Sequence, residues 1–116
     1  MASEIWTVTV DCDNPTDLAR FWQEALGYGV AYEDDDEVAI ESGTKTGPVL
    51  LFLKVPGKKG RKNRLHLDLN PDDQPAEVER LKKLGATEAD IGQGAEVTWV
   101  VLADPEGNAF CVLTPR

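Results

Sequence analysis

The fold is decided by residues 14–28, whose sequence is NPTDLARFWQEALGY. Asn14 can accept a hydrogen bond at the start of a helix, and Pro15 suits the first helical position. Apolar residues then recur three and four positions apart, which predicts a helix with one buried face. Gly27 is the residue type that most often follows the last turn of a helix. The stretch therefore predicts a helix that begins after Asn14 and ends before Gly27.

The elements around this helix occur twice along the chain. A strand with alternating residues precedes the helix, and three short strand candidates follow it, before a loop rich in Lys and Arg. The second half has the same order, and its Leu84-Gly85 repeats Leu26-Gly27 roughly 58 residues later. Each half therefore predicts the order βαβββ. The strand candidates are Ile5–Asp11, Val30–Glu33, Glu37–Glu41, Val49–Val55, Leu65–Leu69, Thr87–Ile91, Glu96–Leu102 and Ala109–Thr114.

Length and charge restrict the kind of protein further. The chain has 116 residues, 41% of them hydrophobic, which is typical of one globular domain. We expect one domain over residues 1–116, with a module at about 4–56, a basic loop at 57–64 and a second module at about 65–115. A net charge of −9 disfavours nucleic acid as a partner, because phosphate would be repelled. No apolar run approaches the ~20 residues of a membrane span, and the acidic start favours the cytoplasm over secretion.

Three motifs together resemble one known superfamily. They are residues 14–28, the stretch KNRLHLDL at 62–69, and DPEGN at 104–108. In this order and spacing they are similar to the vicinal oxygen chelate superfamily, and more narrowly to its small glyoxalase-like and bleomycin-resistance-type proteins. The resemblance implies an α+β fold in which two βαβββ modules form a cupped eight-stranded mixed sheet. It places the helices outside and a ligand cleft inside, and it implies a homodimer.

The resemblance also gives the positions at which metal-dependent members bind a metal ion. Those members use a His or Gln, a Glu, a His and a Glu in the first, fourth, fifth and eighth strands. Here the positions fall on Thr7, near Phe52, on His66 and on Cys111, so only His66 keeps the usual type. A catalytic divalent ion needs three or four protein ligands, so we expect no metal cofactor. A soft metal ion held by His66 and the Cys111 thiolate is the open alternative, with two positions unfilled.

His66 is the only histidine, so any imidazole chemistry depends on it. The alternation of residues 65–69 turns His66 and Asp68 to one face, opposite three leucines. The pair is the candidate for proton transfer, with Asp68 orienting the imidazole. The alternative is that both are polar residues without a role in catalysis.

The end of the chain predicts an aromatic surface. Residues 104–108 form a tight turn, in which Pro105 fixes one φ angle and glycine accepts a positive one. In the hairpin that this turn closes, Val101 is expected opposite Cys111, which puts Trp99 on the same side. Trp99 would then be a platform for a planar or cationic ligand, and Cys111 a reactive thiol or a small hydrophobic residue. The predicted catalytic residues are His66 and Asp68, and the predicted ligand-binding residues are Thr7, Thr9, Phe52, Trp99 and Cys111.

The sequence thus predicts a protein that binds a small organic molecule without a conventional metal centre, with drug sequestration as one version. One alternative is a metal-dependent lyase, isomerase or dioxygenase of the glyoxalase type, in which Glu33 or Glu41 supplies a missing ligand. Another is a structural dimerisation module. The acidic stretch Asp34–Glu37 and the basic stretch Lys58–Arg64 are expected to be solvated loops, with a bound cation or phosphate as their respective alternatives.

Overall fold

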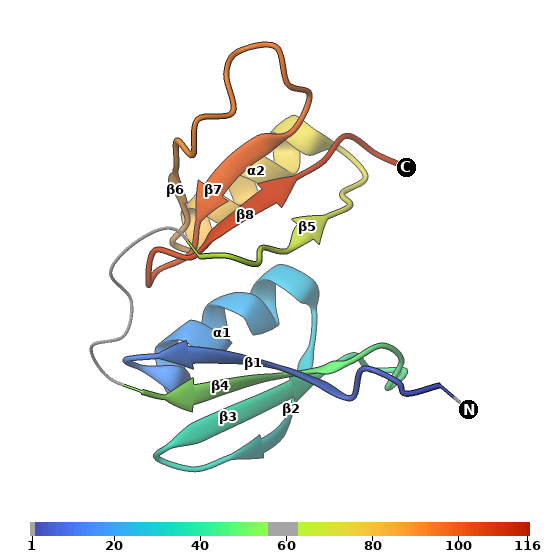
Figure 1. Cartoon of the computed structure of the whole chain (residues 1–116), viewed down its shortest axis with the longest axis vertical. Coiled ribbons are helices and arrows are strands. Elements are labelled where there is room, and N and C mark those ends of the chain that lie inside the picture. The colour runs from blue at the N-terminus through green and yellow to red at the C-terminus, as the bar shows by residue number, and fades with distance from the viewer. Residues whose placement is uncertain (1, 56–62) are drawn as a thin grey trace. The chain divides into compact units, whose positions relative to one another are not determined.

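The computed structural model describes residues 2–55 and 63–116 (Figure 1). The chain divides into two compact units, residues 1–59 and 60–116. In its described residues, each unit contains one helix and one four-stranded mixed sheet, which confirms the α+β class predicted from the sequence. Most of the basic stretch Lys58–Arg64 lies outside the described residues. Among the described residues, no helix has the length and hydropathy needed to cross a membrane.

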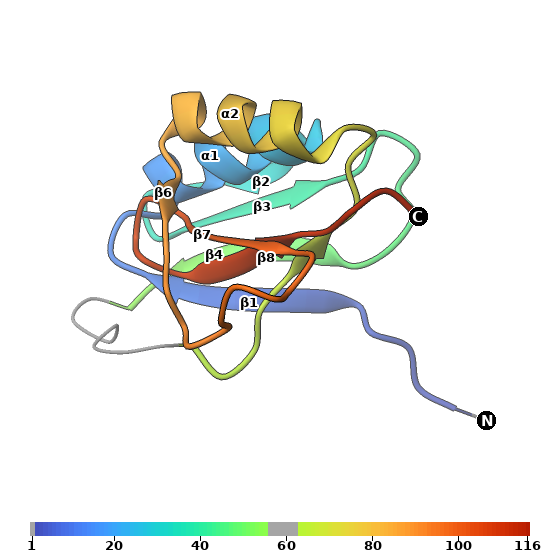
Figure 2. The same cartoon turned by 90° about the horizontal axis from the view of Figure 1, so that it is seen from above.

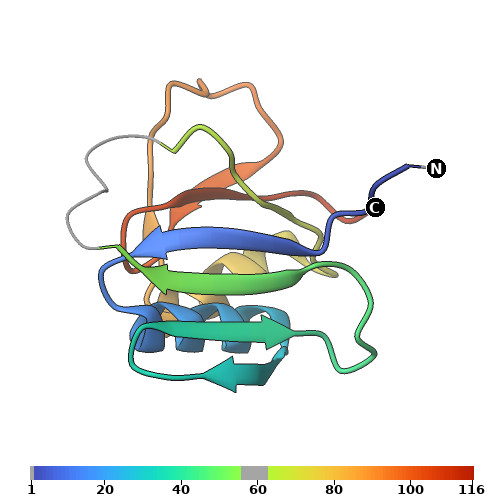
Figure 3. The same ribbon diagram turned by 60° about the horizontal axis from the view of Figure 1, so that its bottom comes forward.

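The first unit is built in the order strand, helix and three strands. Its elements are β1 (Thr7–Cys12), α1 (Pro15–Leu26), β2 (Gly29–Glu33), β3 (Glu37–Glu41) and β4 (Val49–Lys54). The strands lie side by side in the order β1-β4-β3-β2 (Figure 3). Strand β1 runs parallel to β4, and the other neighbours are antiparallel.

Helix α1 begins and ends where the sequence predicts. The backbone amide of Asp17 donates to Asn14 Oδ1 at 3.1 Å, which satisfies one donor of the first turn. Gly27 ends the helix with a φ of 72°, which glycine adopts without a side-chain clash. The buried face of α1 packs against β3 and β4, where every second residue is buried. The core of this unit includes Leu18, Phe21, Trp22, Val38, Ile40, Leu50 and Phe52.

The second unit repeats this arrangement. Its elements are β5 (Asp68–Leu69), α2 (Gln74–Leu84), β6 (Thr87–Glu88), β7 (Val100–Ala103) and β8 (Ala109–Val112). The strand order is β5-β8-β7-β6, and the first strand again runs parallel to the last. This order matches that of the first unit strand for strand, so the predicted repetition of βαβββ is confirmed.

Helix α2 lies along one face of β7 and β8, and the segment between β6 and β7 passes over the other face (Figure 2). Alternate residues of these strands point toward the helix, which packs against β8. Leu81 of α2 is fully buried, and so are Leu102 of β7 and Val112 of β8. The neighbouring residues Val101 and Cys111, which pair with each other, therefore point to the face away from α2.

Strands of this unit are shorter than the sequence predicts. Strand β6 ends at Glu88 rather than Ile91, and β7 begins at Val100 rather than Glu96. In the segment between them, side chains accept hydrogen bonds from the backbone. Asp90 Oδ1 accepts from the amide of Gly92 at 2.7 Å, in a turn that competes with the pairing of strands. Local turns of this kind were not predicted.

The turn between β7 and β8 forms as predicted and has a buried carboxylate. Asp104 is only 4% exposed. Its Oδ1 accepts hydrogen bonds from the backbone amides of Glu106 and Asn108, both at 3.0 Å, and its Oδ2 accepts from the Asn108 side chain at 3.0 Å. Gly107 has a φ of 84°, as this turn requires. The carboxylate therefore fixes the geometry of the turn that joins β7 to β8.

We expect Asp104→Ala to lower the free energy of unfolding by about 1–3 kcal/mol, because the substitution leaves two part-buried backbone amides without their carboxylate acceptor. Urea denaturation measures the difference. Asp35 lies in an exposed turn of the first unit, so Asp35→Ala is the matched control, with a change below about 0.5 kcal/mol. Equal losses in the two variants would contradict the role of Asp104.

Candidate functional site

The face of the second sheet opposite α2 has one register position at which three strands meet. Asp68 of β5 pairs with Cys111 of β8, and Cys111 pairs with Val101 of β7. Paired residues on neighbouring strands point to the same face of a sheet. The pairing of Val101 with Cys111 that the sequence predicts is therefore confirmed. Ala89 and Ile91, from the segment after β6, pack against this apolar part of the face.

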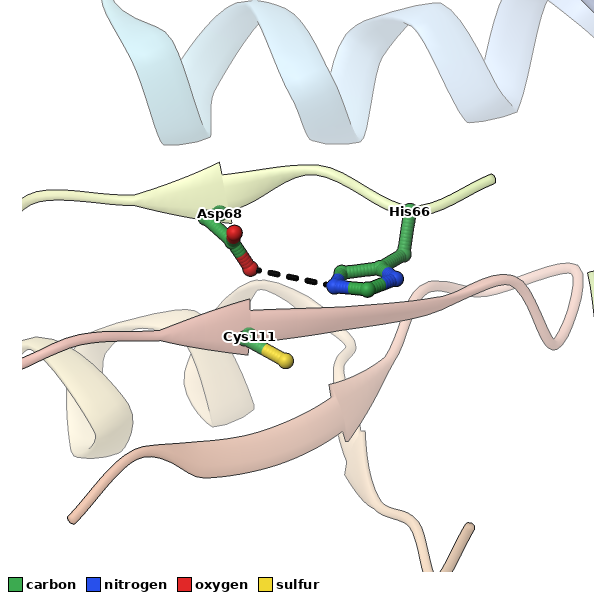
Figure 4. A group of neighbouring side chains, drawn as sticks. All are labelled: His66, Asp68 and Cys111. Atoms are coloured by element: carbon green, nitrogen blue, oxygen red, sulfur yellow. Dashed lines mark ion pairs between the residues drawn. The ribbon is translucent and has the colours of Figure 1, made fainter. Parts of the chain in front are cut away.

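His66 lies just before β5, and its imidazole turns toward Asp68 (Figure 4). His66 Nε2 is 3.2 Å from Asp68 Oδ1, and the two side chains are 43% and 51% exposed. At this distance the carboxylate can orient the ring by a hydrogen bond, as a proton-transfer pair requires. Such an exposed pair contributes little to folding, so both side chains are available for another partner.

Cys111 completes a group of three possible metal ligands. One nitrogen of His66, one carboxylate oxygen of Asp68 and the sulfur of Cys111 all lie within 4.8 Å of one another (Figure 4). Cys111 is 4% exposed and forms no disulfide, whereas the other two side chains are open to solvent. The sequence placed His66 and Asp68 on one face, but it did not identify Asp68 as a ligand beside the thiol.

Trp99 lies immediately before β7, in a bend, and is 38% exposed. The ladder between β7 and β8 ends at the pair Val100 and Val112, so the register does not extend to Trp99. The expected position of Trp99 on the side of Cys111 thus stays a prediction. Its exposure makes it available to a ligand.

In the first unit, the predicted residues divide between the two faces of the sheet. Thr9 pairs with Leu51, whereas Val10 pairs with Phe52, so Phe52 lies on the face opposite Thr9. Thr7 shares the face of Thr9, because residues two apart on a strand point the same way. Phe52 is 0% exposed and belongs to the core under α1. The structure therefore brings Thr7 and Thr9 together with Leu51, and does not bring Phe52 to them.

A pocket of about 580 Å³ lies next to the start of β1. It forms where the residues before β1 meet the connection between β3 and β4, and the amide of Val49 donates to the carbonyl of Trp6 at 3.0 Å. Trp6 is 81% exposed, and two carboxylates and one ammonium group share the pocket with it. This pocket could not be predicted from the sequence, because no local pattern joins the two segments that form it. Its lining is Glu4, Ile5, Trp6, Glu41, Lys45, Gly47 and Val49.

Comparison with known proteins supplies the wider context. The glyoxalase-like domain family matches residues 7–113 of the chain. A glyoxalase/bleomycin resistance protein/dioxygenase family enzyme from Burkholderia phytofirmans PsJN is similar with a TM-score of 0.76 and 15% identity, covering 98% of this chain and 100% of that one. The bleomycin resistance determinant encoded on the transposon Tn5 is similar with a TM-score of 0.63 and 20% identity, covering 98% and 99%.

A third similar structure is the bleomycin-binding protein from bleomycin-producing Streptomyces verticillus, solved as its complex with copper(II)-bleomycin. Its TM-score is 0.64 at 15% identity, and each chain is covered completely, at 100%. No curated protein sequence matches the chain. At these identities the solved structures show that the fold is shared.

The fold and the family match together define the class: an α+β protein built of two βαβββ units. The chain belongs to the glyoxalase-like domain family, whose match spans 7–113. The resemblance to the vicinal oxygen chelate superfamily is thereby confirmed.

The usual oxygen-rich metal set of the superfamily does not fit the residues present. In the first unit, the sheet face opposite α1 has hydroxyl and hydrocarbon groups at Thr7, Thr9 and Leu51, and a catalytic divalent ion that prefers oxygen needs several carboxylates. In the second unit, the imidazole of His66 has a carboxylate and a thiol as neighbours. This second donor set is chemically suited to a different class of metal ion.

The acidic stretch Asp34–Glu37 forms a turn whose first carboxylate is used internally. Asp34 Oδ1 accepts hydrogen bonds from the backbone amides of Asp36 and Glu37, at 2.8 and 2.9 Å. The Tyr32 hydroxyl donates to Asp34 Oδ2 at 2.7 Å. The bond from Tyr32, followed by the backbone bonds, lowers the pKa of Asp34, and the same side-chain bond raises the pKa of Tyr32. The expected solvated turn is what the structure shows.

We expect Tyr32→Phe to raise the pKa of Asp34 toward its ordinary value, because its strongest hydrogen bond is lost. A carboxylate with a lowered pKa stabilises the fold above its unfolded pKa, and this contribution is lost as the pH falls through the folded pKa. Tyr32→Phe should therefore lose less stability on acidification. Carboxyl-carbon NMR titration measures the pKa, and Tyr28→Phe is the control. An unchanged Asp34 titration in Tyr32→Phe would contradict this account.

Proposed function

We propose that this protein binds a small organic molecule that carries positive charge, and that binding rather than catalysis at a conventional metal centre is its function. The observation that carries the proposal is the pocket of about 580 Å³ in the first unit. Its volume lies in the range of pockets that hold small ligands, roughly 300–1,000 Å³. The pocket combines an aromatic side chain with acidic groups, which together suit an organic cation.

The chemistry of the pocket favours a cation over an anion. The indole of Trp6 is largely exposed, so a cationic group can stack on its face. Glu4 and Glu41 supply two negative charges in the pocket, against one positive charge from Lys45. The net charge of −9 for the whole chain raises the local concentration of cations further. An anionic ligand would be repelled by the net negative charge of the pocket and by that of the whole chain.

The relatives support the version in which the protein sequesters a drug. Two similar structures are named for bleomycin resistance and bleomycin binding. In the second unit, exposed Trp99 and the His66–Asp68 pair offer further aromatic and polar contacts, and Thr7 and Thr9 offer hydroxyl groups in the first. These residues are our candidates for ligand contacts outside the pocket. A homodimer and a cytoplasmic location complete the proposal.

A second candidate function is a metal-dependent lyase, isomerase or dioxygenase, and the 3.2 Å contact between His66 and Asp68 favours it. In that case His66 would transfer a proton and Asp68 would orient it. Elemental analysis of protein purified without chelator separates this candidate from the first, because catalysis of this type requires a stoichiometric metal ion. A structural dimerisation module, the third candidate, predicts that no compound shifts the melting temperature.

We expect Trp6→Ala and Glu41→Gln each to weaken binding of an organic cation by about 3- to 30-fold, the size of one cation–aromatic or charge contact. Isothermal titration with metal-free bleomycin and with N-methylquinolinium, in the presence of chelator, measures the affinity. Glu33→Gln removes the same charge from exposed strand β2, outside the pocket, and should leave the affinity within about twofold.

Binding should also weaken as the salt concentration rises, since the attraction is partly between charges. The proposal would be overturned if the wild-type protein bound neither of the two probes in a saturable manner. Equal affinities of the wild-type and Trp6→Ala proteins would overturn it as well.

A further inference from the structure

We propose that the ligand of the pocket near Trp6 is an aromatic zwitterion, which carries a carboxylate as well as a cationic nitrogen, and that Lys45 binds the carboxylate. The inference rests on the proposed function, because it concerns the same pocket. It adds the second charge of the ligand and the residue that selects for it. Lys45 is the one cationic side chain among the described residues that line the pocket.

The charged groups of the pocket do not neutralise one another. Glu4, Glu41 and Lys45 all line it, yet none of the three forms an ion pair with any residue in the described part of the chain. Each charge is therefore available to a ligand, with which it can form a charge-assisted hydrogen bond. A ligand that carries both signs of charge can bind the glutamates and the lysine at the same time.

The backbone holds the opposite charges on separate supports. Ala39 of β3 pairs with Leu51 of β4, and residues two positions apart on a strand point to the same face. Glu41 and Val49 therefore share one face of the sheet, the face opposite α1. Lys45 belongs instead to the turn that joins β3 to β4. The strand thus positions the carboxylate, and the turn positions the ammonium group.

Lys45 has a backbone conformation that lysine rarely adopts. Its φ is 57°, in the left-handed region, and no other non-glycine residue in the described ranges has a positive φ. Hydrogen bonds of the turn maintain this conformation. The amide of Lys45 donates to the carbonyl of Ser42 at 3.0 Å, and the amide of Thr46 donates to Ser42 Oγ at 2.9 Å. Strain of this kind, at a residue that lines a pocket, points to a role for its side chain.

Lys45 also disfavours a ligand that carries positive charge alone. A cationic ring stacked on Trp6 shares the pocket with the ammonium group of Lys45, and like charges repel. A carboxylate on the ligand, directed at Lys45, replaces this repulsion by attraction. The cationic nitrogen then interacts with Trp6 and the glutamates, so every charged group of the pocket has a partner in the ligand.

Isothermal titration with two ligands of the same shape tests the proposal. N-methylquinolinium carboxylate is a zwitterion, and the carboxamide substituted at the same ring carbon replaces the negative group by a neutral one of nearly the same size. We expect the wild-type protein to bind the carboxylate more tightly. In Lys45→Gln, the ratio of the two dissociation constants should shift by about three- to fivefold toward the carboxamide, the size of one exposed ion pair.

Further variants separate the charge of Lys45 from the conformation of its turn. Asparagine adopts the left-handed region readily, so Lys45→Asn should keep the turn and shift the ratio as Lys45→Gln does. Lys45→Arg retains the charge and should keep the preference. Lys54→Gln is the matched control and should not change the ratio. Lys54 is exposed at the other end of β4, outside the pocket and roughly 16 Å from Val49, which exceeds the screening length of physiological salt.

The results distinguish failure of this inference from failure of the proposed function. If both ligands bind and the ratio is unchanged in Lys45→Gln and Lys45→Asn, the inference is wrong and the pocket still binds cations. A wild-type protein that binds the carboxamide more tightly than the carboxylate also overturns the inference alone. If the wild-type protein binds neither ligand, the proposed function fails, and this inference fails with it.

Discussion

The parallel pairing of the first strand with the last is the constraint on which each unit depends. Two parallel strands cannot be joined by a tight turn, so the chain has to cross over between them, and here the crossover includes the helix. The helix covers one face of the sheet and forms the core there. The same pairing brings Asp68 beside Cys111, although most of the second unit separates them in sequence. The core and the candidate metal site therefore follow from one topological feature.

Much of this could be predicted from local sequence, because local physics determines it. Asn14 and Gly27 set the limits of α1 through a side-chain hydrogen bond and a left-handed backbone, and both effects act within a few residues. The turn at Asp104 is predictable for the same reason, and it fixes the register that pairs Val101 with Cys111. Repetition of these local signals also revealed the two βαβββ units.

The candidate sites could be predicted only in part. They depend on which face of the sheet each strand residue points to, and on contacts between segments far apart in the sequence. A shift of one residue moves a strand side chain to the other face, so the uncertainty at Phe52 was enough to place a core residue among the predicted ligand contacts. The pocket near Trp6 forms between two segments that no pattern connects. Between β6 and β7, the side chain of Asp90 accepts a hydrogen bond from the backbone amide of Gly92. This bond competes with strand pairing, and the alternation of residues does not reveal it.

The two units differ in residue type on one face of the sheet and agree on the other. Positions of one unit can be matched to those of the other by counting back from the helix caps Asn14 and Asp73 and by following the parallel strand pairs. The matched pairs opposite the helix are Thr7 and His66, Thr9 and Asp68, and Leu51 and Cys111. On the helix side, Phe52 and Val112 match, and both are fully buried. Packing against the helix restricts that side to apolar residues, whereas the opposite face tolerates hydroxyl, imidazole, carboxylate and thiol groups. New chemistry can therefore arise in one unit without any change to its core.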